Sequence, residues 1–183
     1  MSRRGFTLVE VVILIGLIGL ILTVLSSLFL IFNRTAKVQD ALVSTAGSAG
    51  SIVNGIQAVV HPADQVLVSH AFATGTYASG TSTLVAQIPS IDSSGNVVAS
   101  KEDYAVIYQT GTSVYRRIEA DAASSRQTGT KLLGINSSSL TFTYDQVDFS
   151  QVASVTVDIG TQAAVKQQTF TSHLRERIYL RNR

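Results

Sequence analysis

The feature that most constrains this chain is an uncharged run near its N-terminus. Val11–Phe32 covers 22 residues without Asp, Glu, Lys or Arg. As a helix, such a run is about 33 Å long, against roughly 30 Å for the hydrocarbon core of a bilayer. A secretory signal has a shorter apolar region of about 7–15 residues, followed by a cleavage site with small residues. Here Leu28–Phe32 continues the run past the small pair Ser26 and Ser27. The sequence therefore predicts a retained membrane anchor.

The remainder of the chain predicts one exported domain behind this anchor. With 183 residues there is room for one membrane element and one compact domain, but not for two large domains. After Asn33 the composition shifts to Ser, Thr, Gly and Gln with short apolar runs. Arg3 and Arg4 favour a cytoplasmic N-terminus, although Arg34 and Lys37 beyond the anchor make that bias slight. We expect a single-pass protein of the cytoplasmic (inner) membrane with an exported C-terminal domain.

One carboxylate stands at the head of the anchor. Glu10 lies between Val9 and Val11, and no other charge follows until Arg34. A charged side chain costs roughly 2.5–3.5 kcal/mol at the centre of a membrane helix and less near the interface. The unpaired N–H groups at a helix N-terminus favour a carboxylate there. The residues leave two interpretations open, a carboxylate with a function and one that the interface merely tolerates.

The residues around Glu10 resemble the leader of type IV prepilins. That family has a short basic leader ending in Gly, then Phe, Thr, Leu, an aliphatic residue and Glu, then a long apolar helix. The chain matches each of these positions with Arg3-Arg4-Gly5-Phe6-Thr7-Leu8-Val9-Glu10. Gly19 also stands where such pilins usually carry a glycine. The chain departs from many major pilins at Leu25–Leu28, a region in which it has no proline.

The resemblance implies processing and assembly into a fibre. A membrane prepilin peptidase would cleave between Gly5 and Phe6 and methylate the new amine of Phe6. Glu10 would pair with the N-terminal amine of a neighbouring subunit. The four-residue spacing of Phe6 and Glu10, which places both on one helix face, agrees with such a pairing. The implied partners are other pilin or pseudopilin subunits, the inner-membrane assembly platform, and membrane lipid before assembly.

The helical pattern continues beyond the anchor. Apolar residues spaced three or four apart form one stripe, which Pro62 ends: Val38, Leu42, Ala46, Ala49, Val53, Ile56 and Val60. Glycines weaken this part of the helix, so the stripe must pack on the following β region or on a coiled-coil partner. We therefore expect four segments: a leader (1–5), a transmembrane anchor and assembly helix (6–33), an amphipathic continuation of the helix (34–62) and a β-rich exported domain (63–183).

Alternating strand and turn signals fill the exported domain. The predicted strands are Gln65–Phe72, Thr83–Ile88, Tyr104–Gln109, Ser113–Glu119, Ser139–Asp145, Ser154–Ile159 and Phe170–Leu180. The predicted breaks are Thr74–Ser82, Asp92–Asn96 and Ala120–Lys131. Short connections favour a mainly antiparallel sheet. The expected fold class is α+β and pilin-like, with a long N-terminal helix packed on that sheet.

The downstream strands carry a fainter resemblance. The segments "SVYRRIE", "SLTFTYD", "ASVTVDIG" and the terminal "YLRNR" occur in the order seen in minor pilins and in the J-type minor pseudopilins of type II secretion. This resemblance implies a minor subunit rather than a major one.

The sequence contains no arrangement that predicts catalysis, a cofactor or a metal site. The chain has no cysteine, and His61, His70 and His173 have no second ligand at metal spacing. Acidic and amide side chains in two loops could ligate calcium, but they lack the twelve-residue pattern: Asp92, Asn96, Asp145 and Asp148. The formal charge of +2 depends on Arg3 and Arg4, because +2 − 2 leaves 0 after cleavage. We expect a protein that is not an enzyme.

The C-terminal strand raises one alternative. Five residues would share one face of an extended strand, opposite Leu174, Ile178 and Leu180: Arg175, Arg177, Tyr179, Arg181 and Arg183. Guanidinium groups with a tyrosine could hold phosphates and stack a base. A solvated edge that discourages aggregation is the favoured interpretation, and contact with an acidic neighbouring subunit is another.

Three classes of function therefore compete. A fibre subunit explains the leader, Glu10, the anchor and the α+β domain together. An adhesive or DNA-binding tip subunit, acting in uptake or attachment, shares the same fold. A membrane-tethered enzyme would need a site that the sequence does not contain. The type of apparatus (pilus, competence pilus or type II secretion) does not follow from the residues.

Overall fold

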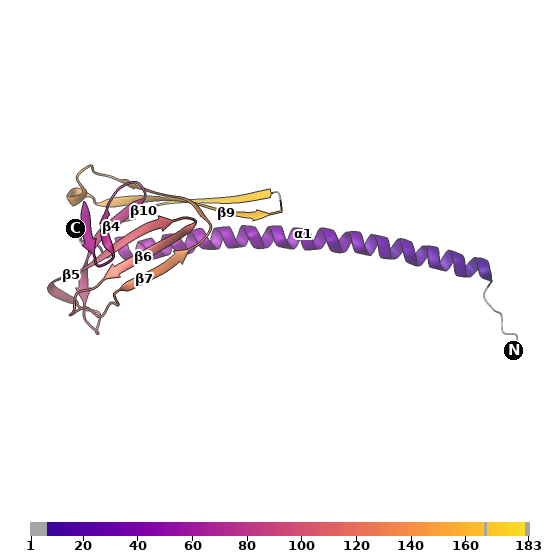
Figure 1. Cartoon of the computed structure of the whole chain (residues 1–183), viewed down its shortest axis with the longest axis horizontal. Coiled ribbons are helices and arrows are strands. Elements are labelled where there is room, and N and C mark those ends of the chain that lie inside the picture. The colour runs from indigo at the N-terminus through magenta and orange to yellow at the C-terminus, as the bar shows by residue number, and fades with distance from the viewer. Residues whose placement is uncertain (1–6, 167, 182–183) are drawn as a thin grey trace. The chain divides into compact units, whose positions relative to one another are not determined.

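The structure is a computed structural model that describes residues 7–166 and 168–181 (Figure 1). One α-helix, α1 (Leu8–Val60), is followed by ten strands and a short 3₁₀ helix, η1 (Phe149–Gln151). The chain divides into two compact units, Met1–Asp40 and Ala41–Arg183, and α1 contributes to both. The predicted cleavage site, Gly5 and Phe6, and the predicted Arg183 lie outside the described residues.

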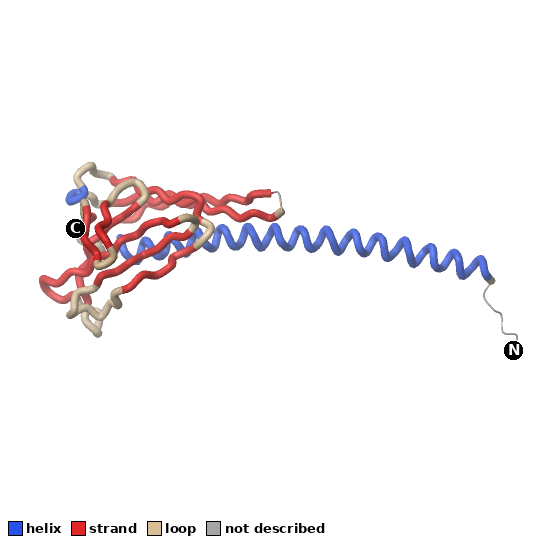
Figure 2. Tube along the Cα trace, in the orientation of Figure 1, coloured by secondary structure: helices blue, strands red, loops and turns tan. Residues whose placement is uncertain are grey.

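Two antiparallel sheets and a hairpin make up the β part (Figure 2). The strands are β1 (Gln65–Val66), β2 (Ser69–Phe72), β3 (Gly75–Ala78), β4 (Thr83–Ile91), β5 (Val97–Thr110), β6 (Ser113–Glu119), β7 (Gly129–Gly134), β8 (Ser137–Tyr144), β9 (Ser154–Val165) and β10 (Gln168–Tyr179). One sheet has the order β1-β4-β5-β6-β7, the other has the order β10-β9-β8, and β2 pairs with β3. Every described pairing is antiparallel. The predicted α+β arrangement of a long helix on a mainly antiparallel sheet is confirmed.

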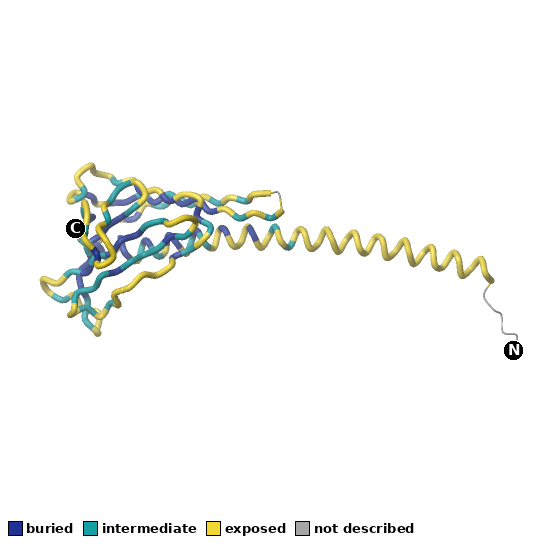
Figure 3. Tube along the Cα trace, viewed as in Figure 1, coloured by how far each residue is buried: buried dark blue, intermediate teal, exposed yellow. Residues whose placement is uncertain are grey.

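The C-terminal part of α1 and both large sheets share one hydrophobic core (Figure 3). Ile52 and Ile56 of α1 are fully buried with Ile107 of the five-stranded sheet and Phe142 and Ile159 of the three-stranded sheet. Burying such a side chain stabilises the fold by about 1.5–3 kcal/mol. Because α1 contributes side chains to this core, the β-rich part packs on residues that precede residue 63.

The stripe predicted on the helix is correct only in its second half. Ala49, Val53, Ile56 and Val60 are buried as expected, but Leu42 is 46% exposed. The buried side runs instead through Ala41 and Thr45. Helical steps of three, four and four residues before Ile52 lead to positions 49, 45 and 41, so Leu42 lies beside the contact face. Thr45 also fits there because its hydroxyl donates a hydrogen bond of 2.9 Å to the Leu42 carbonyl oxygen.

A second, smaller core lies on the other face of the five-stranded sheet. Phe72 of β2 is buried there with Val85 and Val106. Tyr104, from the same face, stacks on His70 with ring centroids 3.8 Å apart. The β2–β3 hairpin therefore covers this face, which explains why β4 is buried on both sides.

Three strand predictions were wrong in this region. Gln65–Phe72 is not one strand, because β1 and β2 belong to different sheets. Strand β3 occupies part of the predicted break Thr74–Ser82, and β7 begins inside the predicted break Ala120–Lys131. Both missed strands are mostly exposed, and they lack the apolar alternation by which strands are recognised, although Leu133 of β7 is buried.

A buried ion pair fixes the loop between β6 and β7. Asp103 of β5 is fully buried, and its Oδ2 accepts a hydrogen bond from Arg126 Nη1 at 2.6 Å. Its oxygens also accept bonds from Ser90 Oγ (2.7 Å), the Asp121 N–H (2.9 Å) and Ser124 Oγ (2.8 Å). Burial alone would raise the pKa of Asp103, but Arg126 and the other donors outweigh burial and hold the pKa below its ordinary value.

Candidate functional site

The described N-terminus of α1 is a capping box. The Glu10 Oε2 atom accepts hydrogen bonds from the Thr7 N–H (2.9 Å) and from Thr7 Oγ1 (3.1 Å). In return, the Glu10 N–H donates to Thr7 Oγ1 at 3.3 Å. The pattern Thr-x-x-Glu at positions 7–10 is the sequence signal for this motif, and the sequence-based prediction did not use it. Glu10 therefore has hydrogen-bond donors within its own chain.

The first part of α1 exposes its apolar surface in all directions. From Leu8 to Phe32, the large apolar side chains are between 44% and 81% exposed. Of the described residues, α1 is the one helix long and apolar enough to cross a membrane, and its most apolar window has no buried residue. Its length and composition are therefore compatible with a single membrane span. A helix that is apolar all round needs lipid or other helices around it.

The predicted arginine face lies on an edge strand. Arg175, Arg177 and Tyr179 alternate with the more buried Leu174 and Ile178 along β10, and all three are exposed. Arg177 and Tyr179 already contact other residues of the chain. Arg177 Nε donates to Ser154 Oγ at 2.9 Å, and its guanidinium lies 5.3 Å from the centre of the Tyr179 ring.

Arg175 and Arg181 of that face have different surroundings. Asp158 of β9 is the direct neighbour of Arg175 across the ladder. Arg181 follows the end of β10 and is exposed, while its backbone N–H donates to the His61 carbonyl oxygen at 2.9 Å. Among the described residues, this face therefore carries Arg175, Arg177 and Tyr179 on β10, and Asp158 lies next to Arg175 on β9.

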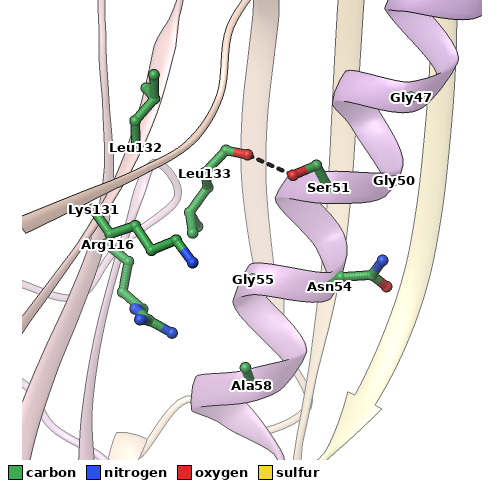
Figure 4. A pocket seen from close by; sticks show the side chains of 10 residues that line it. All are labelled: Gly47, Gly50, Ser51, Asn54, Gly55, Ala58, Arg116, Lys131, Leu132 and Leu133. Carbon is green, nitrogen blue, oxygen red and sulfur yellow. Dashed lines mark hydrogen bonds between the residues drawn. The ribbon is translucent and has the colours of Figure 1, made fainter. Parts of the chain in front are cut away.

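A groove of about 580 Å³ lies between α1 and strands β6 and β7 (Figure 4). Its helix side is lined by small or polar residues: Gly47, Gly50, Ser51, Asn54, Gly55 and Ala58. Its sheet side consists of Arg116, Lys131, Leu132 and Leu133. Ser51 Oγ donates to the Leu133 carbonyl oxygen at 2.8 Å and ties the helix to the strand at this point.

The sequence-based prediction did not identify this groove. Its glycines suggested only a weak helix, and Arg116 belonged to a strand with no known neighbour. The missed strand β7 supplies the other side, so no local sequence signal could place the two sides together.

In the described part of the chain, no three His, Asp or Glu side chains come together in a way that could hold a metal ion. His70 stacks on Tyr104, while Asp92 accepts hydrogen bonds from the Ser94 and Asn96 N–H groups of its own turn. Asp145 and Asp148 likewise accept hydrogen bonds from nearby backbone N–H groups. These carboxylates therefore hold turns.

No family model, no curated protein and no solved structure matches the chain. The functional interpretation therefore depends on the residues and their geometry.

Proposed function

We propose that the chain is a structural subunit of a fibre of the type IV pilus or type II secretion pseudopilus kind, and more narrowly a minor subunit. In this proposal it resides in the cytoplasmic membrane with its β-rich domain exported. It is then cleaved after Gly5, methylated on Phe6 and drawn into the fibre through α1. Other pilin or pseudopilin subunits, the prepilin peptidase and the assembly platform are its partners.

One observation carries the proposal. The uncovered apolar surface of α1, Leu8–Phe32, follows residues that resemble a prepilin cleavage site, and Glu10 is the one carboxylate within it. The capping box with Thr7 accounts for Glu10 in an isolated anchor, but a helix that moves from lipid into a bundle of like helices also needs a cation to pair this charge. The downstream segments that resemble minor pilins support the narrower assignment.

Processing tests the proposal directly. N-terminal sequencing and mass spectrometry of material sheared from cells that contain the peptidase should give a chain that starts at methylated Phe6. A Gly5→Val variant should remain uncleaved in the membrane. A mature wild-type chain that still starts at Met1 or Ser2 would remove the proposal.

A second candidate is an adhesive or DNA-binding tip subunit, favoured by the exposed Arg175, Arg177 and Tyr179 on one face of β10. If the face binds DNA, affinity should fall steeply with salt, and replacing Arg175, Arg177 and Arg181 by Ala should reduce that slope. Absence of binding at low salt would leave a solvated or subunit-facing edge.

A further inference from the structure

We infer that the groove between α1 and β6–β7 receives the loop Asp145–Asp148 of a second copy of this chain. The inference rests on the proposed function, because it describes how exported domains of adjacent copies contact one another. Three observations carry it: two unpaired cations in the groove, small residues on the helix side, and an exposed apolar residue between two carboxylates elsewhere on the surface.

The groove holds two like charges that the chain does not neutralise. Arg116 and Lys131 are direct partners in the β6–β7 ladder, an arrangement that is destabilising for like charges. Val114 and Ile118, on either side of Arg116 in β6, are buried, so Arg116 points toward α1 rather than outward. Its Nε is buried without a hydrogen-bond partner. Among the described carboxylates, none forms an ion pair with Arg116 or Lys131.

The helix side of the groove leaves space for an incoming backbone. A Cβ atom added to Gly47 or Gly50 would have no neighbour within 4 Å. Farther along, Gly55 is already covered by Leu133, which would lie 2.5 Å from an added Cβ. The open part lies beside Gly47 and Gly50, and the side chains of Arg116 and Lys131 lie farther along the helix, level with Gly55 and Ala58 (Figure 4).

The loop between β8 and η1 has the complementary features. Val147 is 99% exposed, more than any other large apolar side chain in the described part of the chain. Asp145 and Asp148 flank it, and both are exposed. Their hydrogen bonds to the Ala153 and Ser150 N–H groups keep the loop in one conformation. The loop thus presents one apolar side chain between two anions, opposite in charge to the two cations of the groove.

One copy does not use its own loop to fill its own groove. Strand β7 and the loop that leads into η1 lie at opposite edges of the exported domain (Figures 1 and 2). A contact between two different patches is heterologous, and such contacts propagate from copy to copy unless the ring closes. The groove and the loop therefore form the two halves of a repeating contact.

Cysteine cross-linking tests this contact, because the chain has no cysteine of its own. The full chain with Asn54→Cys and Val147→Cys is oxidised in membranes and in the sheared fibre fraction. Both positions are exposed, and a disulfide forms only when the two Cα atoms come within about 4.4–6.8 Å. We expect a ladder of dimers and larger species, and no species beyond a dimer with either cysteine alone. No ladder, or a closed dimer only, would overturn the inference.

A charge exchange separates the contact from chance collisions. Lys131→Glu in the double-cysteine chain places a carboxylate against Asp145 and Asp148 and should reduce cross-linking about tenfold. Adding Gln146→Lys should restore it. Lys166→Glu makes the same change at an exposed position of the β9–β10 turn and should leave the yield unchanged. Equal losses with Lys131→Glu and Lys166→Glu would contradict the inference.

The two proposals fail in different ways. If the wild-type chain starts at Phe6 and is found in fibres, but the cysteine pair gives no ladder, the fibre function stands and the contact is wrong. If the ladder forms in membranes while the wild-type chain still starts at Met1 or Ser2, the contact stands and the fibre function is wrong.

Discussion

At the scale of single residues, Glu10 has two roles that can be separated. Its carboxylate caps α1 through Thr7, and we propose that it also pairs with the amine of a neighbouring subunit. Glutamine can replace glutamate in a capping box, but it carries no charge. Thr7→Ala has the opposite effect, because it removes the cap at a cost of about 0.5–2 kcal/mol while it keeps the carboxylate.

We therefore predict that Glu10→Gln inserts and is cleaved normally but is nearly absent from fibres. The neighbour's amine would enter an apolar bundle unpaired, at a cost of several kcal/mol. Thr7→Ala should assemble to a clearly greater extent. Co-purification with sheared fibres, together with quantitation of processed chain in the membrane, measures both variants. Normal assembly of Glu10→Gln would show that Glu10 acts only as a cap or an interfacial residue.

At the scale of elements, the glycines of α1 differ in what surrounds them. Gly47 has open space where a Cβ would lie, so Gly47→Ala should stabilise the fold by about 0.5–1 kcal/mol through better helix propensity. Gly55→Ala brings a methyl group 2.5 Å from the buried Leu133, and such overpacking typically costs about 1–3 kcal/mol. Denaturation of the full chain in detergent micelles, followed by tyrosine fluorescence, should show shifts of opposite sign. Equal stabilisation by both would mean that Leu133 can move aside without cost.

Elements also differ in how well the sequence predicted them. Periodicity predicted the helix and the strands rich in Val, Ile and Tyr, because their buried sides are regular. Pro62 predicted where the helix ends, and α1 ends at Val60. Periodicity did not predict strands β3 and β7, since neither shows a regular alternation of apolar residues, although each pairs with the strand directly before it.

At the scale of the whole molecule, a candidate site could be predicted where its residues are close together in the sequence, and not where separate elements form it. Glu10 and the apolar run are contiguous in sequence, and the alternation in β10 is local, so both could be located without a structure. The groove combines α1 with β6 and β7, although strands β1 to β5 lie between them in the sequence. Its two cations, Arg116 and Lys131, are neighbours only because the register of the β6–β7 ladder places them opposite each other.

The stability of the β-rich domain should depend on pH through Asp103, which links β4, β5 and the β6–β7 loop. A carboxyl group whose pKa is lowered in the folded state contributes stability that is complete above its unfolded pKa, about 3.9. That contribution is lost as the pH falls through the lower folded pKa. Glu102 changes stability with pH in the opposite direction, because burial and the nearby Asp64 raise its pKa. The effect of Asp103 is therefore measured as the difference between the wild-type chain and a variant changed at Asp103 alone.

Asp103→Asn should therefore be much less stable than the wild-type chain at pH 7, by about 3–5 kcal/mol, because Arg126 loses its buried partner. The difference between the two chains should stay constant down to about pH 4 and shrink at lower pH, since the wild-type carboxylate is then protonated as well. Denaturation in micelles at several pH values, followed by the fluorescence of the six tyrosines, measures this difference. Asp92→Asn, a change in an exposed turn, is the matched control and should alter stability far less. A difference between wild type and Asp103→Asn that stayed constant to pH 2 would mean that the ion pair does not hold the loop through its charge.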